Sequence, residues 1–270
     1  MTTSPQGDPS FDDVTTWAPS GGEQVPTGTV PPVWMQGRAS FGGLPVAAAL
    51  RAVRFLAPDR PVRSFLVQFV GPLGPTPATL ATRVLRAGRS MSTVEARVQQ
   101  DGQEPVVVIA SLGGDRPSAI EVAGPTRPER PDPDSLTSFP FLEGVTPSFT
   151  RFFEFRWTDG AYPFTGSDEG VLGGWVRHRT AATDPLLAAV GLMDAWPAPI
   201  LSLAKGPCPA SSVTWSVDIA DLPADPSGWW WLRSETVEAR AGYGSFRGEL
   251  HAPDGRLAAH YSQRVAVFDG

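Results

Sequence analysis

The order of predicted elements in this chain of 270 residues occurs twice, and this duplication constrains the fold more than any other feature. An alanine-rich helical run at 44–58 is followed by four β-rich runs. A second apolar helical run at 186–203 is also followed by four β-rich runs. In each copy an Asp-Gly pair, at 101–102 and at 254–255, separates the last two runs as a hairpin turn would. The repeated order indicates the tandem duplication of one supersecondary unit.

Both helical runs are poor in charge and rich in small side chains, which is typical of a helix that is buried on all sides. Two arrangements are compatible with this pattern. In the simpler one, two α+β subdomains each curl an antiparallel sheet around one helix and join their sheets into one body. In the other, each helix lies on one side of an open sheet.

Composition divides the chain into four segments. Residues 1–28, rich in Ser, Thr, Pro and Gly, are predicted to be a flexible arm. The first repeated unit is expected at 29–115 and the second at 149–270, and the Pro- and acid-rich stretch 116–148 is predicted to link them.

Charge and residue usage exclude several functional classes. The formal net charge of −6 argues against a nucleic-acid partner, because phosphate binding needs a basic face. Cys208 is the single cysteine, and His178, His251 and His260 have no metal-ligand spacing, so we expect no disulfide and no metal site. Motifs for a nucleophile elbow, a phosphate loop or a dinucleotide fold are absent, and no cofactor is predicted.

The hydropathy pattern argues against a membrane protein. We expect no apolar run that approaches the 18 residues of a membrane span. The first residues, MTTSPQGDPSFDD, lack the basic and apolar regions of a secretory signal. The expected location is therefore the cytoplasm.

A few polar residues stand out within apolar surroundings. Asp194 interrupts the second helical run, where a carboxylate is costly unless it is paired, although a solvated place before Pro197 is an equal alternative. Gln263 interrupts the last strand. Ser212 and Thr214 alternate along one strand and are expected to share a face.

A glycine pair, Gly42-Gly43, opens the first helix. Backbone N–H groups at a helix start can hold an anion or polarise a carbonyl, although such a pair can also simply form a turn.

Three segments together resemble a known family. These are GRASFGGLPVAAALRAV at 37–53, the entry FRWTDGAY with GGWVRHR, and YGSFRGELHAPDGRLAAHYSQRVAVF at 243–268. They are similar to the double-hotdog acyl-CoA thioesterases of the thioesterase II type, over roughly residues 30–115 and 150–270. The resemblance implies an α+β double hotdog, in which each antiparallel sheet wraps one helix.

The resemblance also implies a reaction and its residues. In that family an Asp on the second helix, a hydroxyl on the following strand and a Gln on the last strand hold a water against the thioester carbonyl. These positions correspond to Asp194, Ser212 and Gln263, with Thr214 as the alternative hydroxyl, while the Gly42–Gly43 amides would take the oxyanion. The implied activity is hydrolysis of acyl-CoA to free acid and CoA.

The sequence departs from the family where Thr214-Trp215 replaces an Asp-His pair. This departure keeps open a non-catalytic acyl-CoA binding or assembly protein with a decayed site. A hotdog hydratase or dehydratase acting on enoyl thioesters is a weaker alternative, because Asp194 has no histidine near it on its helix. The family resemblance further implies acyl-CoA as the small-molecule partner and a possible homo-oligomer.

Overall fold

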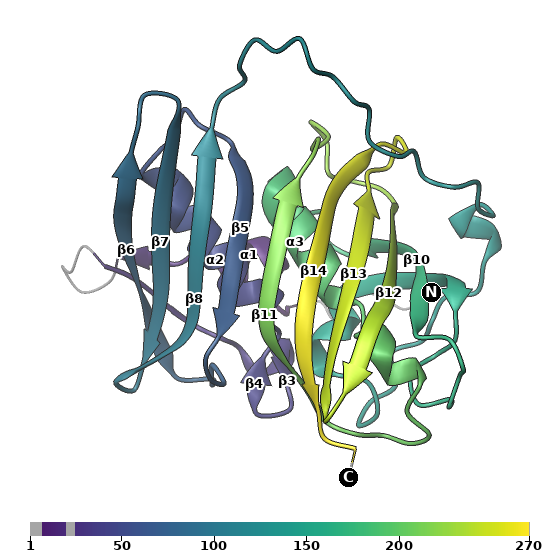
Figure 1. The fold of residues 1–270 in the computed structure, drawn as a ribbon. Coiled ribbons are helices and arrows are strands. Elements are labelled where there is room, and N and C mark those ends of the chain that lie inside the picture. The colour runs from purple at the N-terminus through teal and green to yellow at the C-terminus, as the bar shows by residue number, and fades with distance from the viewer. Residues whose placement is uncertain (1–6, 20–24, 270) are drawn as a thin grey trace.

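The computed structural model describes residues 7–19 and 25–269 (Figure 1). The chain forms three α-helices, four short 3-10 helices and fourteen strands within these residues. The helices are α1 (Phe11–Thr15), η1 (Pro32–Trp34), α2 (Gly43–Phe55), η2 (Pro133–Ser135), η3 (Ser148–Phe152), α3 (Pro185–Ala195) and η4 (Pro199–Ser202). The strands are β1 (Ala18–Pro19), β2 (Pro26–Thr29), β3 (Met35–Gln36), β4 (Ala39–Ser40), β5 (Val62–Phe69), β6 (Pro77–Ala87), β7 (Met91–Gln100), β8 (Gln103–Gly113), β9 (Phe153–Gly160), β10 (Val171–His178), β11 (Ala210–Ile219), β12 (Trp230–Arg240), β13 (Tyr243–His251) and β14 (Leu257–Val267).

Twelve of these strands form one antiparallel sheet, and the order of its strands confirms the duplication. The order is β1-β2-β6-β7-β8-β5-β11-β14-β13-β12-β10-β9. Read outward from the centre, β5, β8, β7 and β6 in one half match β11, β14, β13 and β12 in the other. The halves meet where β5 pairs with β11, with Leu66 opposite Ser216 at the middle of the contact. In the turn between β7 and β8, Asp101 and Gly102 both have positive φ, at 50° and 74°, which the predicted Asp-Gly hairpin requires.

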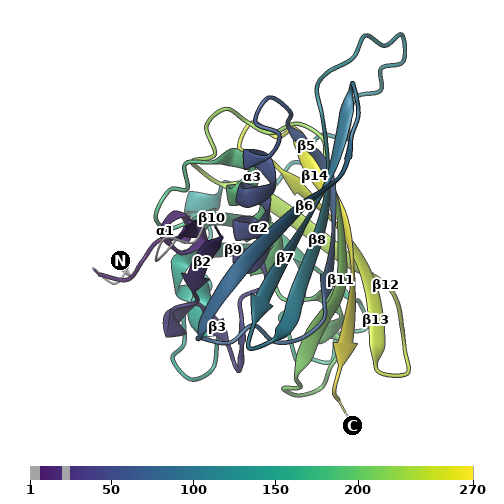
Figure 2. The same cartoon turned by 90° about the vertical axis from the view of Figure 1, so that its left-hand side faces the viewer.

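The two long helices lie side by side on one face of this sheet, which curls around them (Figure 2). They are antiparallel, because the start of α2 contacts the end of α3 through Gly43 and Asp194, and the end of α2 contacts the start of α3 through Arg54 and Asp184. Ten of the eleven residues of α3 are apolar, and nine are buried. This confirms two helix-wrapped sheets joined into one body, a double hotdog.

The N-terminal segment differs from the flexible arm that its composition predicts. Residues 7–19 are packed, and Phe11, Val14 and Trp17 are buried in the core. Ser10 begins α1 with a capping box to Asp13, and the carboxylate of Asp12 accepts bonds from the backbone and side chain of Thr183. The arm prediction is therefore wrong for these residues, since three apolar side chains fix them to the core. Residues 1–6 and 20–24 of the predicted arm lie outside the described residues.

The segment between the halves crosses the top of the molecule and then covers part of the second half on the face away from the helices (Figure 1). The guanidinium of Arg127 stacks on the ring of Trp175, whose indole N–H donates to the carbonyl of Pro131. Arg130 pairs with Asp159 at the end of β9. The linker is thus attached to the second sheet by its arginines.

One segment is long and apolar enough to cross a membrane, by length and composition alone. Pro185–Ser202 reaches 18 residues with a mean hydropathy of 1.3, and 72% of it is buried inside the fold. The expectation that no apolar run approaches this length is therefore wrong. Helix α3 itself ends at Ala195, shortly before Pro197, and its apolar surface is covered by the sheet and α2.

Candidate active site

Asp194 lies in the last turn of α3, where it faces the first turn of α2. The N–H of Gly43 donates to Asp194 Oδ2 over 2.7 Å. A Cβ on Gly42 would lie 2.9 Å from the same oxygen, so the carboxylate needs the glycine beside it. A carboxylate at a helix N-terminus is also favoured by the helix dipole. The start of α2 therefore pairs with the carboxylate of Asp194, which remains partly exposed to solvent.

The same position changes the acidity of Asp194. Burial raises the pKa of the Asp194 carboxyl from 3.8 to about 7, against the opposing effect of hydrogen bonds from Gly43 and from the Gln263 side chain. Desolvation penalises the charged form of a carboxyl group and so makes it a stronger base. At neutral pH Asp194 is thus able to accept a proton.

Gln263 and Ser212 come from neighbouring strands and meet beside Asp194. Gln263 lies on β14 and is 7% exposed, and its Nε2 donates to Ser212 Oγ over 2.6 Å. Since Ser212 Oγ accepts this bond, its own hydrogen remains available to another acceptor. The Gln263 amide therefore links the hydroxyl of Ser212 with the carboxylate of Asp194.

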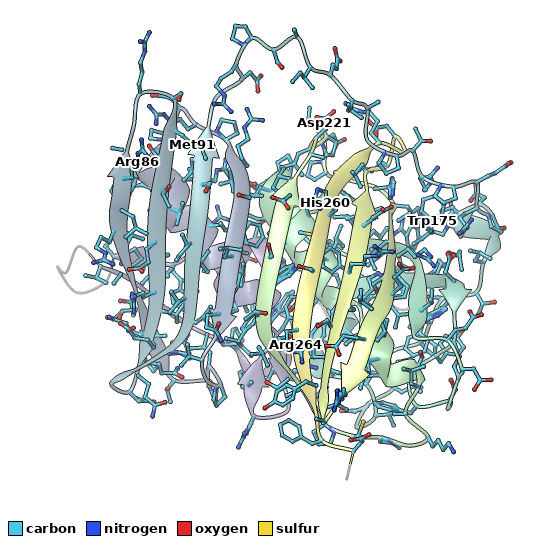
Figure 3. The ribbon with its side chains drawn as sticks, in the orientation of Figure 1. Arg86, Met91, Trp175, Asp221, His260 and Arg264 are labelled. Atoms are coloured by element: carbon cyan, nitrogen blue, oxygen red, sulfur yellow. The ribbon has the colours of Figure 1, made fainter. Side chains whose placement is uncertain are left out.

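Thr214 does not belong to this group, because a β-bulge separates it from Ser212. Ser212 pairs with Val265 and Thr214 with Arg264, so Val213 is an extra residue between them. Ser212 thereby faces the helices, while Thr214 is exposed on the other face. Arg264, opposite Thr214 in the register, projects from that outer face (Figure 3). The prediction that the two hydroxyls share a face is wrong, since the bulge shifts the alternation by one residue.

The two hydroxyls give a matched pair of variants. For the acyl-CoA hydrolysis that the family resemblance implies, we expect Ser212→Ala to lower kcat/KM by about 10- to 100-fold, because the hydroxyl expected to help hold the attacking water is removed. Thr214→Ala, on the opposite face, should keep the wild-type value within about twofold, as surface substitutions usually do. Steady-state thiol release measures both. An equal loss in the two variants would contradict the assignment.

The strands of the first half provide a natural comparison for the site. The β5–β11 register makes Val62 the counterpart of Ser212 and Ala110 the counterpart of Gln263. The bulge is duplicated as well, between Val62 and Ser64. The hydroxyl and the amide are therefore absent from the equivalent place, although its backbone is alike.

The helices differ between the halves in the same way. Asp194 at the end of α3 bonds to the start of α2, whereas Arg54 at the end of α2 pairs with Asp184 at the start of α3. Asp184 already caps its own helix by accepting from the N–H groups of Leu186 and Leu187. At the contact between the end of α2 and the start of α3, the carboxylate is therefore engaged in a salt bridge. Only the contact between the end of α3 and the start of α2 brings a carboxylate, an amide and a hydroxyl together in the described chain.

Gly43 has a different role from the one expected. The sequence places Gly42 and Gly43 at the helix start, as the structure does, with Gly42 as the N-cap of α2. However, the N–H of Gly43 is bonded to Asp194 and does not point to a substrate. Sequence reasoning missed this contact because the partners are 151 residues apart, and only the antiparallel helices bring them together.

The three histidines lie apart from Asp194, Ser212 and Gln263. His178 lies partly buried against the carbonyl of Ala188, and its desolvation lowers its pKa to about 4. His251 is fully buried beside Glu249, and His260 lies on the outer face with Asp218. No group of three or more His, Cys, Asp and Glu residues with metal-binding geometry occurs in the described chain.

Two family models match the chain over most of its length. The model of the acyl-CoA thioesterase N-terminal domain matches residues 30–113, and the model of the acyl-CoA thioesterase C-terminal domain matches residues 128–267. The division between the two models falls in the linker. No curated protein sequence matches the chain.

Solved structures share the fold at low identity. A conserved protein of unknown function with a hot dog fold from Alicyclobacillus acidocaldarius is 22% identical with a TM-score of 0.83, and 96% of this chain and 98% of that chain are covered. A putative thioesterase II from Thermobifida fusca is 21% identical with a TM-score of 0.81, covering 96% and 97%. The tesB protein of Mycobacterium avium subs paratuberculosis is 20% identical with a TM-score of 0.78, covering 96% and 98%.

These structures support the double hotdog fold, while the domain matches carry the family assignment. Because the C-terminal model alone spans more than half of the residues and the N-terminal model covers the other half of the duplication, the chain belongs to the acyl-CoA thioesterase family.

Proposed function

We propose that the chain hydrolyses the thioester of acyl-CoA to a free carboxylic acid and CoA, using a water held by Asp194, Gln263 and Ser212. The observation that carries the proposal is that these three side chains meet on the inner face of the sheet. They meet where the end of α3 contacts the start of α2, and the equivalent position at the other end of the helix pair lacks them. A thioester carbonyl is reactive enough to be attacked by an activated water without a covalent intermediate.

In the proposed reaction the ionised Asp194 accepts a proton from the water as the water oxygen bonds to the thioester carbon. The carbonyl oxygen becomes an oxyanion, for which the N–H of Gly42 at the start of α2 is the candidate donor. Collapse of the tetrahedral intermediate breaks the carbon–sulfur bond. The proton on Asp194 then passes to the departing thiolate, which regenerates the carboxylate.

The two alternative functions fit the site less well. A decayed, non-catalytic site was suggested by Thr214-Trp215, but Thr214 faces away from the three polar side chains, which are all retained. A hydratase needs a histidine beside the carboxylate. His178, the histidine that contacts α3, lies at Ala188 in the first half of that helix, and its low pKa keeps it neutral.

The test is thiol release from a panel of acyl-CoA thioesters of increasing chain length. We expect turnover on at least one member at about 1–10³ s⁻¹, the usual range of enzymes. Cys208 is partly exposed and would react with a thiol reagent, so Cys208→Ser is the suitable background. Absence of release with every thioester would contradict the proposal, and tight binding without turnover would support the non-catalytic alternative.

A further inference from the structure

Exposure along the inner face of β11 shows in which direction an acyl group can run. Asp194 and Ser212 are both partly exposed, so solvent and substrate reach the site from their side. The next inward-facing residues along β11 are Trp215 and Val217, which are 1% and 0% exposed. A thioester whose CoA part remains outside therefore directs its acyl group past Gln263 and towards Trp215.

Trp215 stands directly behind the site. It pairs with Gln263 across β11 and β14, and Cβ atoms of such directly opposed residues are about 4.5–5.5 Å apart. Its side chain lies on the inner face of the sheet, as that of Gln263 does, and is 1% exposed. The buried indole therefore lies immediately beyond the amide of Gln263.

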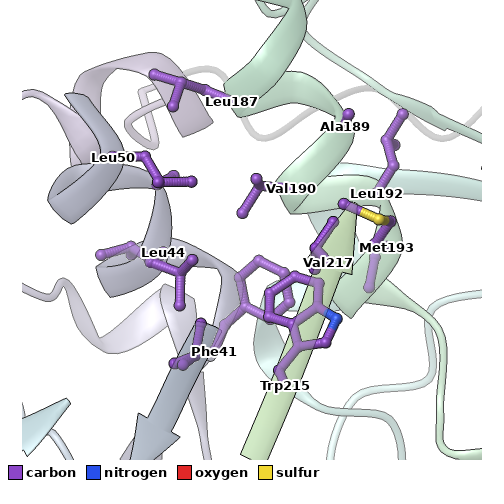
Figure 4. Packing of buried hydrophobic residues seen from close by; sticks show 14 of the residues in the cluster. Phe41, Leu44, Leu50, Leu187, Ala189, Val190, Leu192, Met193, Trp215 and Val217 are labelled. Atoms are coloured by element: carbon purple, nitrogen blue, oxygen red, sulfur yellow. The ribbon is translucent and has the colours of Figure 1, made fainter. Parts of the chain in front are cut away.

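The indole is fixed by large buried neighbours. Its ring packs edge-on against Phe65 at 5.6 Å and against Tyr261 at 6.3 Å between centroids. On the helix side it lies beneath Leu44 of α2 and Met193 of α3 (Figure 4). Edge-to-face aromatic pairs of this kind stabilise the orientation of both rings. A longer acyl chain would have to displace the indole from a core that is packed on every side.

We propose that Trp215 forms the end wall of the acyl pocket and restricts the enzyme to short acyl groups. This inference rests on the proposed function for the place of the carbonyl, and it assigns a substrate class to that site. Trp215 acts by excluding bulk and takes no part in the proton transfers.

The wild-type length profile is the first test. We expect kcat/KM for butanoyl-CoA to exceed that for dodecanoyl-CoA by at least about tenfold, as a pocket that rejects extra methylenes does. Trp215→Phe, Trp215→Leu and Trp215→Ala should then raise the ratio of dodecanoyl to butanoyl activity in that order, by about tenfold or more at the end of the series. The control is Trp231→Leu, an equally buried tryptophan on β12 whose ring stacks with Arg130 of the linker. It should leave the ratio unchanged.

Binding separates this inference from the proposed function. Butyl and dodecyl thioether analogues of CoA cannot be hydrolysed, and their Kd values report the pocket without turnover. If no thioester is hydrolysed but the butyl analogue binds tighter than the dodecyl one, and Trp215→Leu reverses the order, the pocket assignment stands while the proposed function fails. A wild type that uses or binds both lengths alike overturns the inference, whether or not the variants fold. So does an unchanged ratio in variants whose melting transition remains cooperative.

Discussion

Replacing Asp194 by asparagine is expected to lower kcat/KM for acyl-CoA hydrolysis by about 10²–10⁴-fold, the usual contribution of a positioned general base. The amide keeps the shape of the carboxylate, and its oxygen can still accept the bond that Gly43 donates to Asp194. It cannot take a proton from water. The loss should therefore appear mainly in kcat, and thiol release under saturating substrate measures it.

Asp218→Asn is the matched control for this variant. Asp218 lies on β11, the strand of Ser212, but its side chain is 58% exposed and pairs loosely with His260. The same chemical change there should leave kcat/KM at the wild-type value. If Asp194→Asn retained wild-type activity, the water would be activated by another group and the proposed mechanism would be wrong.

The double hotdog could be predicted from the sequence because each half carries its own helix, strands and Asp-Gly turn. The same order of elements can be recognised in each half of the sequence, and the strands of the two halves take matching positions in the sheet. Asp194 and Gln263 were likewise visible as polar residues in apolar runs, and family resemblance gave them roles. The structure adds that they lie in contact.

The features that the sequence did not predict depend on a one-residue shift in strand pairing or on contacts between distant parts of the chain. Strict alternation places Ser212 and Thr214 on one face, and only the inserted Val213 separates them. Composition alone suggested a loose N-terminal arm. Its capping residue Ser10 and its apolar Phe11 indicate a docked helix instead, because a short helix is stable only when its apolar side is buried.

The proposed base also predicts a pH dependence of catalysis. The pKa of Asp194 is raised to about 7 by burial, and only its ionised form accepts a proton. We therefore expect log(kcat/KM) to rise by about one unit per pH unit below pH 7 and to level off above it. Tyr261 faces Asp194 from β14, but burial and the charge of Asp194 raise its pKa, so it stays neutral throughout. His178, with a pKa of about 4, is neutral above pH 5. A rate that is flat between pH 5 and 8 would contradict the role of Asp194.

The same raised pKa predicts an opposite trend in stability. In the unfolded chain Asp194 ionises near its ordinary value of 3.8, whereas in the folded chain it holds its proton up to about pH 7. Between these values the unfolded state binds fewer protons, so this residue lowers the free energy of unfolding as pH rises, and its effect is constant above pH 7. Asp194→Asn removes the penalty. Denaturant titrations should therefore show the variant gaining on the wild type from pH 4 to pH 7 while it loses activity. A constant difference across that range would mean that the carboxyl group titrates near its ordinary pKa in the folded chain, and the pH–rate profile should then lack its inflection near pH 7.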